Sequence, residues 1–165
     1  MFNQTQKLSR RRSLLGHWDP LFNGRVAVSG DLVAFGANDG RTGQVFVFRT
    51  TDGGSTFTHT LNITGDTNSG SRIDRQSGHF GMQVAVSGDL LAVGAMLEYS
   101  NTGVLDAGTI HVFRITNHHG LKATRIQKLN NGNVSEVGPF GKFVAVSGDT
   151  VIGVACKDSI GPFVA

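Results

Sequence analysis

Cysteine is almost absent from this 165-residue chain: Cys156 is the only one, so no disulfide can form within it. Long apolar runs are missing too, and none approaches the ~18 residues that a membrane-spanning helix needs. The N-terminus also lacks the apolar core of a secretory signal, because the basic residues at 7 and 10–12 are followed by few apolar residues before His17. These absences leave the cellular location unknown.

An excess of charge is lacking as well. The formal net charge is +3, and Arg10, Arg11 and Arg12 account for all of it, so the rest of the chain is close to neutral. A general nucleic-acid binder would carry a basic face, and we therefore expect no nucleic-acid partner. We also find no nucleophile–base motif, no phosphate-binding loop and no zinc-ligand spacing. We expect no catalytic residues, no cofactor and no enzyme activity.

What the sequence does contain is a repeat. The hexapeptide Val-Ala-Val-Ser-Gly-Asp occurs three times, at 26–31, 84–89 and 144–149. Its serines are 58 and then 60 residues apart. A nearly fixed period of this size indicates one supersecondary unit copied along the chain. The 23 glycines, about twice the usual share, suit a fold with many tight turns.

Each copy is expected to form several short strands, because apolar and polar residues alternate between turn signals. The expected strands are 25–29, 32–37, 44–49 and 56–63 in the first copy, 83–87, 90–95, 108–116 and 123–129 in the second, and 142–147 and 151–155 in the third, with another beginning within 161–165. This pattern predicts an all-β fold made of β-propeller blades, each of four antiparallel strands. About two and a half blades are present, whereas a closed propeller has roughly four to eight.

Residue size along these strands predicts how the blades pack. The Gly-Asp pair after each serine is expected to form a two-residue hairpin turn, with both residues at positive φ. Small residues are expected near a crowded propeller axis; they are Ala27, Gly36, Ala37, Ala85, Gly94 and Ala95. Larger ones are expected to fill the space between blades; they are Phe46, Phe48, Ile110 and Val112.

The repeat also predicts the domain organisation. The expected units are a basic segment at 1–20 (the last strand of a preceding blade plus a linker), blade 1 at 21–64, an inter-blade loop at 65–79, blade 2 at 80–130, an inter-blade loop at 131–139 and the first half of blade 3 at 140–165. Two interpretations of the incomplete ring stay open. Either the chain is a fragment of a longer product, or other chains complete the propeller, including copies of itself.

The copies resemble the FG-GAP repeat, the blade unit of the integrin α-subunit propeller and of many other extracellular propellers. The resemblance rests on Phe80-Gly81 and Phe140-Gly141 before the first strand, on Val93-Gly94-Ala95 at the end of the second, and on the third strands at 43–48 and 108–113. The first copy departs slightly, with Phe22-Asn23-Gly24 in place of Phe-Gly. The resemblance covers residues 21–156 and implies an extracellular or cell-surface location.

The calcium loop of integrin-type blades is missing here. Its form, Asp-x-Asp-x-Asp-Gly-x-x-Asp, supplies a cation with six to eight oxygens, whereas this chain has only Ser-Gly-Asp. We interpret Asp31, Asp89 and Asp149 as turn residues and expect no metal site. A weak calcium candidate is Asp66, Asn68 and Asp74, for which a polar loop between blades is the favoured interpretation.

Binding is expected where the longer loops gather. These join strand two to strand three and strand four to the next blade, at 38–42, 65–79, 96–107 and 130–139. Long loops on a rigid scaffold commonly carry binding residues. The candidates for a ligand-binding face are Arg41, Arg72, Asp74, Arg75, Glu98, Tyr99, Asp106 and Glu136. The alternative for any one of them is an ordinary solvated loop residue.

Mixed charge and one aromatic residue on this face suit a polar protein or a glycan partner. The leading hypothesis is a non-enzymatic propeller segment acting as an adhesion-type interaction module. The first alternative is a structural propeller within a larger extracellular hydrolase or lyase, and the second is a gene fragment without independent function.

Overall fold

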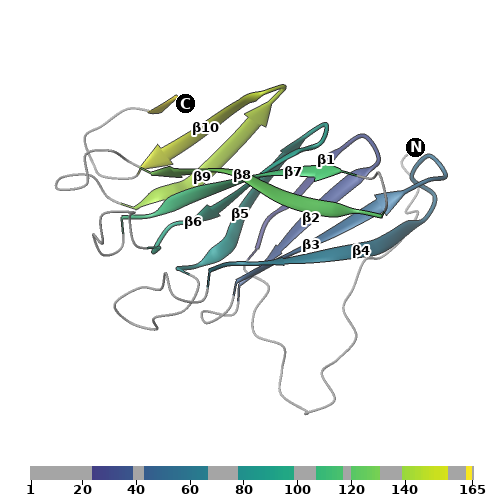
Figure 1. Ribbon diagram of the computed structural model, residues 1–165, viewed down its shortest axis with the longest axis horizontal. Coiled ribbons are helices and arrows are strands. Elements are labelled where there is room, and N and C mark those ends of the chain that lie inside the picture. Colours follow the sequence, from purple (N-terminus) through teal and green to yellow (C-terminus); the bar gives the residue numbers. More distant parts are fainter. Residues whose placement is uncertain are drawn as a thin grey trace, which may run out of the picture.

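The computed structural model describes residues 24–38, 43–66, 78–98, 107–116, 120–130, 139–155 and 163–164. Within these ranges the fold is all-β and consists of three antiparallel sheets (Figure 1). The strands pair in the order of the sequence, so neighbouring strands are joined by local connections. The expected architecture of antiparallel four-stranded blades is confirmed.

Each sheet corresponds to one copy of the repeat. Blade 1 contains β1 (Val26–Ser29), β2 (Leu32–Ala37), β3 (Gln44–Thr50) and β4 (Phe57–Thr64). Blade 2 contains β5 (Phe80–Ser87), β6 (Leu90–Ala95), β7 (Thr109–Thr116) and β8 (Lys122–Asn130). Blade 3 contains β9 (Phe140–Ser147), β10 (Thr150–Ala155) and β11 (Phe163–Val164). The third strand expected within 161–165 is therefore present, as β11 paired with β10.

The repeated hexapeptide forms the same hairpin in all three blades. Ser29 pairs with Leu32, and the equivalent residues pair in the other two blades, which leaves a two-residue Gly-Asp loop each time. The loop glycine has a φ of 57°, 56° or 55°. The expectation of positive φ at both positions is wrong, because His79 is the only non-glycine residue with positive φ among those described. One positive φ, at the first loop position, fits a type II′ turn.

The hairpin serine joins one blade to the next. The Gly88 amide of blade 2 donates to Ser29 Oγ of blade 1 at 2.9 Å, and the Gly148 amide of blade 3 donates to Ser87 Oγ at 3.0 Å. The three hairpin tips point the same way (Figure 1). Ser-Gly therefore does more than form the turn: its serine hydroxyl and its glycine amide also connect neighbouring blades.

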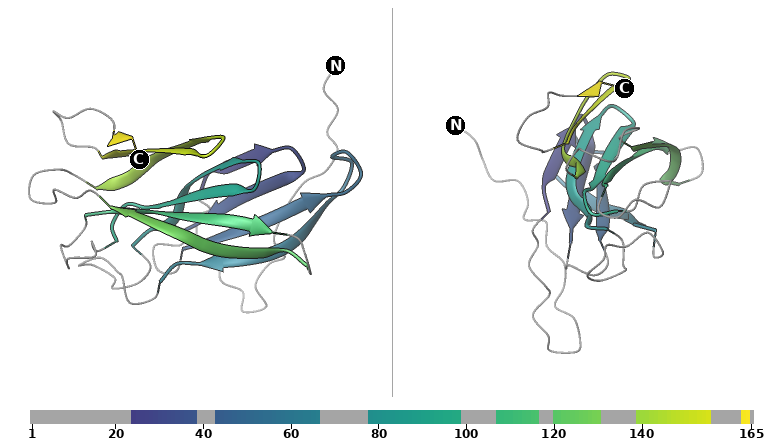
Figure 2. Two further views of the ribbon diagram at one scale, coloured as in Figure 1. Left: turned by 45° about the horizontal axis from the view of Figure 1, so that its top comes forward. Right: turned by 90° about the vertical axis from the view of Figure 1, so that its left-hand side faces the viewer.

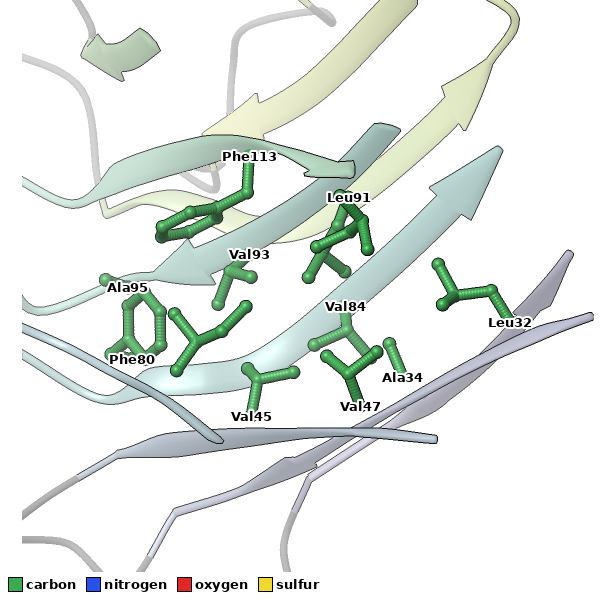
Figure 3. Close-up of a cluster of buried hydrophobic side chains, with 12 residues drawn as sticks. Leu32, Ala34, Val45, Val47, Phe80, Val84, Leu91, Val93, Ala95 and Phe113 are labelled. Carbon is green, nitrogen blue, oxygen red and sulfur yellow. The ribbon is translucent and has the colours of Figure 1, made fainter. Parts of the chain in front are cut away.

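Successive blades lie side by side (Figure 2), and hydrophobic side chains fill the spaces between them. Between blades 1 and 2 the buried cluster comprises Leu32, Ala34, Val45, Val47, Ile63, Phe80, Val84, Leu91, Val93, Ala95, Phe113 and Ile115 (Figure 3). Between blades 2 and 3 it comprises Leu90, Ala92, Ile110, Val112, Phe140, Val151 and Ala155. Removing these apolar surfaces from water is the main force holding the blades together.

The expected positions of the large residues are only partly correct. Ile110 and Val112 do lie between two blades. Phe46 and Phe48 instead lie on the face of blade 1 that points away from blade 2, because side chains alternate along β3 and Val45 and Val47 point toward blade 2. There both phenylalanines pack against the ring of His59, with ring centroids 5.8 and 5.3 Å from it.

Small residues mark the contact between blades, here called the seam. A Cβ atom added to Gly36 in blade 1 would lie 1.9 Å from the carbonyl oxygen of Gly81 in blade 2. The second seam repeats this contact, with 2.2 Å between a Cβ on Gly94 and the carbonyl oxygen of Gly141. In blades 2 and 3, the Phe-Gly backbone therefore packs directly on a strand-two glycine of the preceding blade.

The Phe-Gly pair also lengthens the first strand of blades 2 and 3. β5 and β9 begin at Phe80 and Phe140, three and two residues before the predicted starts. Gly81 and Gly141 each have a φ of 82°, and the pairing register of β5 shifts between Phe80 and Gln83. This β-bulge was hidden in the sequence because it interrupts the alternation on which the strand prediction depended.

Replacing Gly94 with Val should destabilise the protein, because the new side chain would meet the backbone of Gly141. We expect the free energy of unfolding to fall by about 1–3 kcal/mol or more, measured by urea denaturation. Thr124→Val, which puts the same side chain on the exposed part of β8, is the control and should change it by less than about 0.5 kcal/mol. Equal stability of the two variants would contradict the seam.

The β3–β4 turn contains a second testable feature. The Thr50 hydroxyl donates to Asp52 Oδ1 at 2.6 Å, and the Thr56 amide donates to the same oxygen at 2.8 Å. These hydrogen bonds favour the ionised carboxylate, the Thr50 bond most strongly, and lower the pKa of Asp52 from 3.8 to about 2.

The lowered pKa of Asp52 predicts a pH dependence. The folded-state pKa lies below the unfolded one, so the stabilisation is present above about pH 4 and is lost as the pH falls toward 2. An NMR titration of the Asp52 carboxyl should show a midpoint near 2, and Thr50→Val should move it toward the ordinary value. A midpoint near 3.8 in the unmodified protein would contradict the turn geometry.

Candidate interaction surface

The loops that connect the strands lie at two opposite ends of the blades. β2, β4, β6 and β8 all end at one end of the blades, and we call this the long-loop end; the Ser-Gly-Asp hairpins lie at the other end. Seven predicted face residues lie outside the described residues: Arg41, Arg72, Asp74, Arg75, Tyr99, Asp106 and Glu136. Their role in binding stays a prediction. The eighth, Glu98, is described in full.

Glu98 lies three residues after β6, and its side chain is buried, with only 1% of it exposed. Its backbone is fixed on both sides: its amide donates to the carbonyl of Ala95 at 3.1 Å, and its carbonyl accepts from the amide of Gly108 at 2.9 Å. Gly78 approaches so closely that a Cβ there would lie 2.4 Å from Glu98 Cα. The Glu98 carboxylate therefore lies inside the protein, beneath the long-loop end, and not on its surface.

From the part of the chain that the structure describes, Lys128, His111 and Thr109 contact the Glu98 carboxylate. Lys128 Nζ on β8 donates to Oε1 at 2.9 Å. His111 Nε2 on β7 lies 2.5 Å from Oε2, which also accepts from the Thr109 hydroxyl. A buried carboxylate is costly unless it is paired and hydrogen-bonded, and here both oxygens have partners, one of them a cation.

The second nitrogen of His111 indicates which tautomer is present. Arg125 Nη1 lies 3.3 Å from His111 Nδ1, and a guanidinium can only donate hydrogen bonds. Nδ1 is therefore the acceptor, and the proton on Nε2 points to Glu98. This assignment follows from the partners, as is usual for histidine. The imidazole also packs edge-on against Phe80, with ring centroids 5.2 Å apart.

Arg125 extends the network to blade 1. Its Nη1 donates to Asp66 Oδ2 at 2.7 Å, across 59 positions of sequence. Asp66 follows β4 closely, so this half-exposed ion pair connects the end of blade 1 to β8 of blade 2. The network Glu98–Lys128–His111–Arg125 thus lies within blade 2, and its Arg125–Asp66 ion pair connects it to blade 1 at the long-loop end.

Of the weak calcium candidate, Asp66 binds Arg125, whereas Asn68 and Asp74 lie outside the described residues. Asp31 and Asp89, which we interpreted as turn residues, pair with Arg49 and Arg114 within their own blades, at 3.1 and 3.0 Å. Over the described ranges, no group of three or more His, Cys, Asp or Glu side chains is placed to hold a metal ion.

Sequence reasoning missed the network apart from Glu98 and Asp66. One signal was available: His111 stands where the first copy has Phe46, a polar ring in place of an apolar one at an equivalent strand position. Nothing in the sequence pointed to Lys128 or Arg125, because basic residues on an outer strand are ordinarily solvated.

The comparisons with known proteins agree with the fold. A family model described as FG-GAP repeat matches residues 75–113, which include β5, β6 and the first part of β7. The chain therefore contains an FG-GAP repeat, in its second copy. No curated protein matches the chain. Among the described residues, no helix is long and apolar enough to cross a membrane.

Replacing Glu98 with Gln should destabilise the long-loop end of blade 2, because Lys128 would lose its buried counter-charge. Removing one partner of a buried ion pair costs about 3–5 kcal/mol. We expect about 3 kcal/mol by urea denaturation at neutral pH, since the Lys128 side chain stays 21% exposed. The control Asp89→Asn breaks an exposed pair and should cost at most about 1 kcal/mol. An equally small loss for Glu98→Gln would show that the buried network does not stabilise the long-loop end of blade 2.

Proposed function

We propose that this chain is a non-enzymatic FG-GAP propeller segment that acts as an adhesion-type interaction module. In this proposal a protein or a glycan binds across the loops at the long-loop end. The observation that carries the proposal is the network around Glu98, which anchors the start of one long loop to the strands β7 and β8 of blade 2. A loop that is held rigidly at its start loses less conformational entropy when a partner binds, which favours binding.

Binding is favoured over catalysis by the burial of the groups that could react. The Thr109 hydroxyl and the His111 ring lie 3.2 Å apart, a distance that would suit a nucleophile and its base. Both residues are almost fully buried, however, and both are already bound to Glu98. Their burial and these bonds support a structural role for the pair.

The chemistry of the predicted face suits a polar partner. Arg72, Asp74 and Arg75 give the loop at 65–79 both positive and negative charge. Tyr99, in the next long loop, adds an aromatic ring immediately after Glu98. Tyrosine and arginine are enriched among residues that dominate binding energy. A glycan would use the same residues, since aromatic rings pack on sugar faces and charged groups bind hydroxyls.

The proposal is tested by screening the purified chain against arrays of glycans and of extracellular proteins. Any ligand found is then titrated against two variants. Tyr99→Ala and the double change Arg72→Glu, Arg75→Glu should each weaken binding about tenfold, equivalent to ~1.4 kcal/mol. Asp149→Lys, at an exposed hairpin tip on the opposite end, is the control and should bind normally. Binding lost only in the control, or no ligand in either array, would overturn the proposal.

A further inference from the structure

His111 is a buried titratable group with a charged side chain at each of its two ring nitrogens. It lies on β7, and only 1% of its side chain is exposed. Nε2 donates to the Glu98 carboxylate at 2.5 Å, and Nδ1 accepts from Arg125 Nη1 at 3.3 Å. A protonated imidazole is a donor at both nitrogens and has no acceptor. One added proton would therefore remove the contact with Arg125 and leave the contact with Glu98 in place.

The charged groups around His111 come from three of the elements near it. Glu98 follows β6, whereas Arg125 and Lys128 lie on β8. Asp66 follows β4 of blade 1 and is connected to the ring through Arg125. The contact from β5 is an uncharged aromatic ring. Among these described groups the two carboxylates balance the two cations, so a proton on the ring would add an uncompensated positive charge inside the protein.

The same nitrogen of Arg125 makes both of its contacts. Nη1 has two hydrogens, and it donates to His111 Nδ1 and, at 2.7 Å, to Asp66 Oδ2. The imidazole of blade 2 thereby holds this nitrogen in the position from which it binds the carboxylate of blade 1. The side chains of Arg125 and Asp66 are 43% and 45% exposed, so both can bind water when they separate.

We propose that His111 is a proton-operated switch for the contact between blades 1 and 2 at the long-loop end. Uptake of a proton at Nδ1 places two donors and two positive charges face to face, so that Arg125 moves away and its ion pair with Asp66 opens. The Nε2–H bond to Glu98 stays and gains the attraction of opposite charges. Repulsion next to a buried ring outweighs the half-exposed ion pair, because a charge pair is less screened inside a protein than at its surface.

Blade 1 lacks this switch because the equivalent position is apolar. Phe46 lies opposite Asn62 in the strand pairing, just as His111 lies opposite Lys128. The two blades share the strand framework, and an aromatic ring fits the position with or without nitrogen atoms. The inference goes beyond the proposed function and is independent of it, because it concerns a contact between blades and involves no ligand.

NMR spectroscopy of the full chain tests the switch over about pH 8 to 5, the range in which histidine side chains ordinarily change charge. Imidazole nitrogen shifts report the proton on His111. The guanidinium N–H signals of Arg125 report its ion pair, because a bound guanidinium rotates slowly and keeps its Nη signals separate. We expect these signals to merge in step with proton uptake by His111.

Arg114 is the matched control for the Arg125 signals. It forms an ion pair with Asp89 of similar exposure, 42% and 49%, at the hairpin end of the same blade and away from His111. Its signals should stay unchanged while those of Arg125 merge. A simultaneous change in both would point to protonation of aspartate or to general loosening, and would contradict the inference.

Two variants separate the proton from the presence of an aromatic ring. His111→Phe introduces the residue of blade 1, removes the acceptor and should merge the Arg125 signals already at about pH 8. His111→Asn keeps an oxygen acceptor near the place of Nδ1 but takes up no proton. Its Arg125 signals should therefore stay separate down to about pH 5.

Proton uptake by His111 with unchanged Arg125 signals would overturn the inference. So would a folded chain in which His111 takes up no proton over this range, or a folded His111→Asn variant whose Arg125 signals still merge as the pH falls. Should circular dichroism show either variant unfolded, the unmodified chain decides: merging at Arg125 in step with His111 and not at Arg114 supports the switch, and any other outcome contradicts it.

Discussion

The contact on which the rest of the structure depends is between backbones: the Phe-Gly segment of one blade packs on a glycine in the second strand of the preceding blade. Because no side chain separates the two backbone segments there, the blades approach closely enough for Val84 of blade 2 to lie beside Val47 and Ala34 of blade 1 in the hydrophobic cluster (Figure 3). The glycines contribute little energy themselves. They set the spacing at which apolar burial, the larger force, becomes available.

Polar contacts fix the two ends of the first seam in different ways. At the hairpin end, a serine hydroxyl receives the glycine amide of the next blade, and the second seam repeats this contact. At the long-loop end, Arg125 of blade 2 pairs with Asp66 of blade 1, beside the buried carboxylate of Glu98 with Lys128 and His111 within blade 2. Such a buried charge contributes specificity of arrangement more than net stability, since its desolvation offsets much of the attraction.

The differences between copies bear on function more than the repeats do. Where copy one has Phe46, copy two has His111, and this exchange makes the anchor beneath the proposed binding loops. Where blades 1 and 2 have a seam glycine, blade 3 has Val154, which gives its strand two a side chain at that position. In both cases, one residue in a shared framework gives a blade a property that its neighbours lack.

The sequence by itself determined the repeat, the all-β class and most strand positions, because alternation and turn residues act over a few neighbouring positions. It missed the starts of β5 and β9, where a bulge interrupts the alternation. Only the tertiary structure placed Glu98 inside the protein and joined it to Lys128, 30 residues away. It also moved Phe46 and Phe48 to the face of blade 1 that points away from blade 2. These outcomes depend on which faces of different strands meet, and local sequence does not encode that.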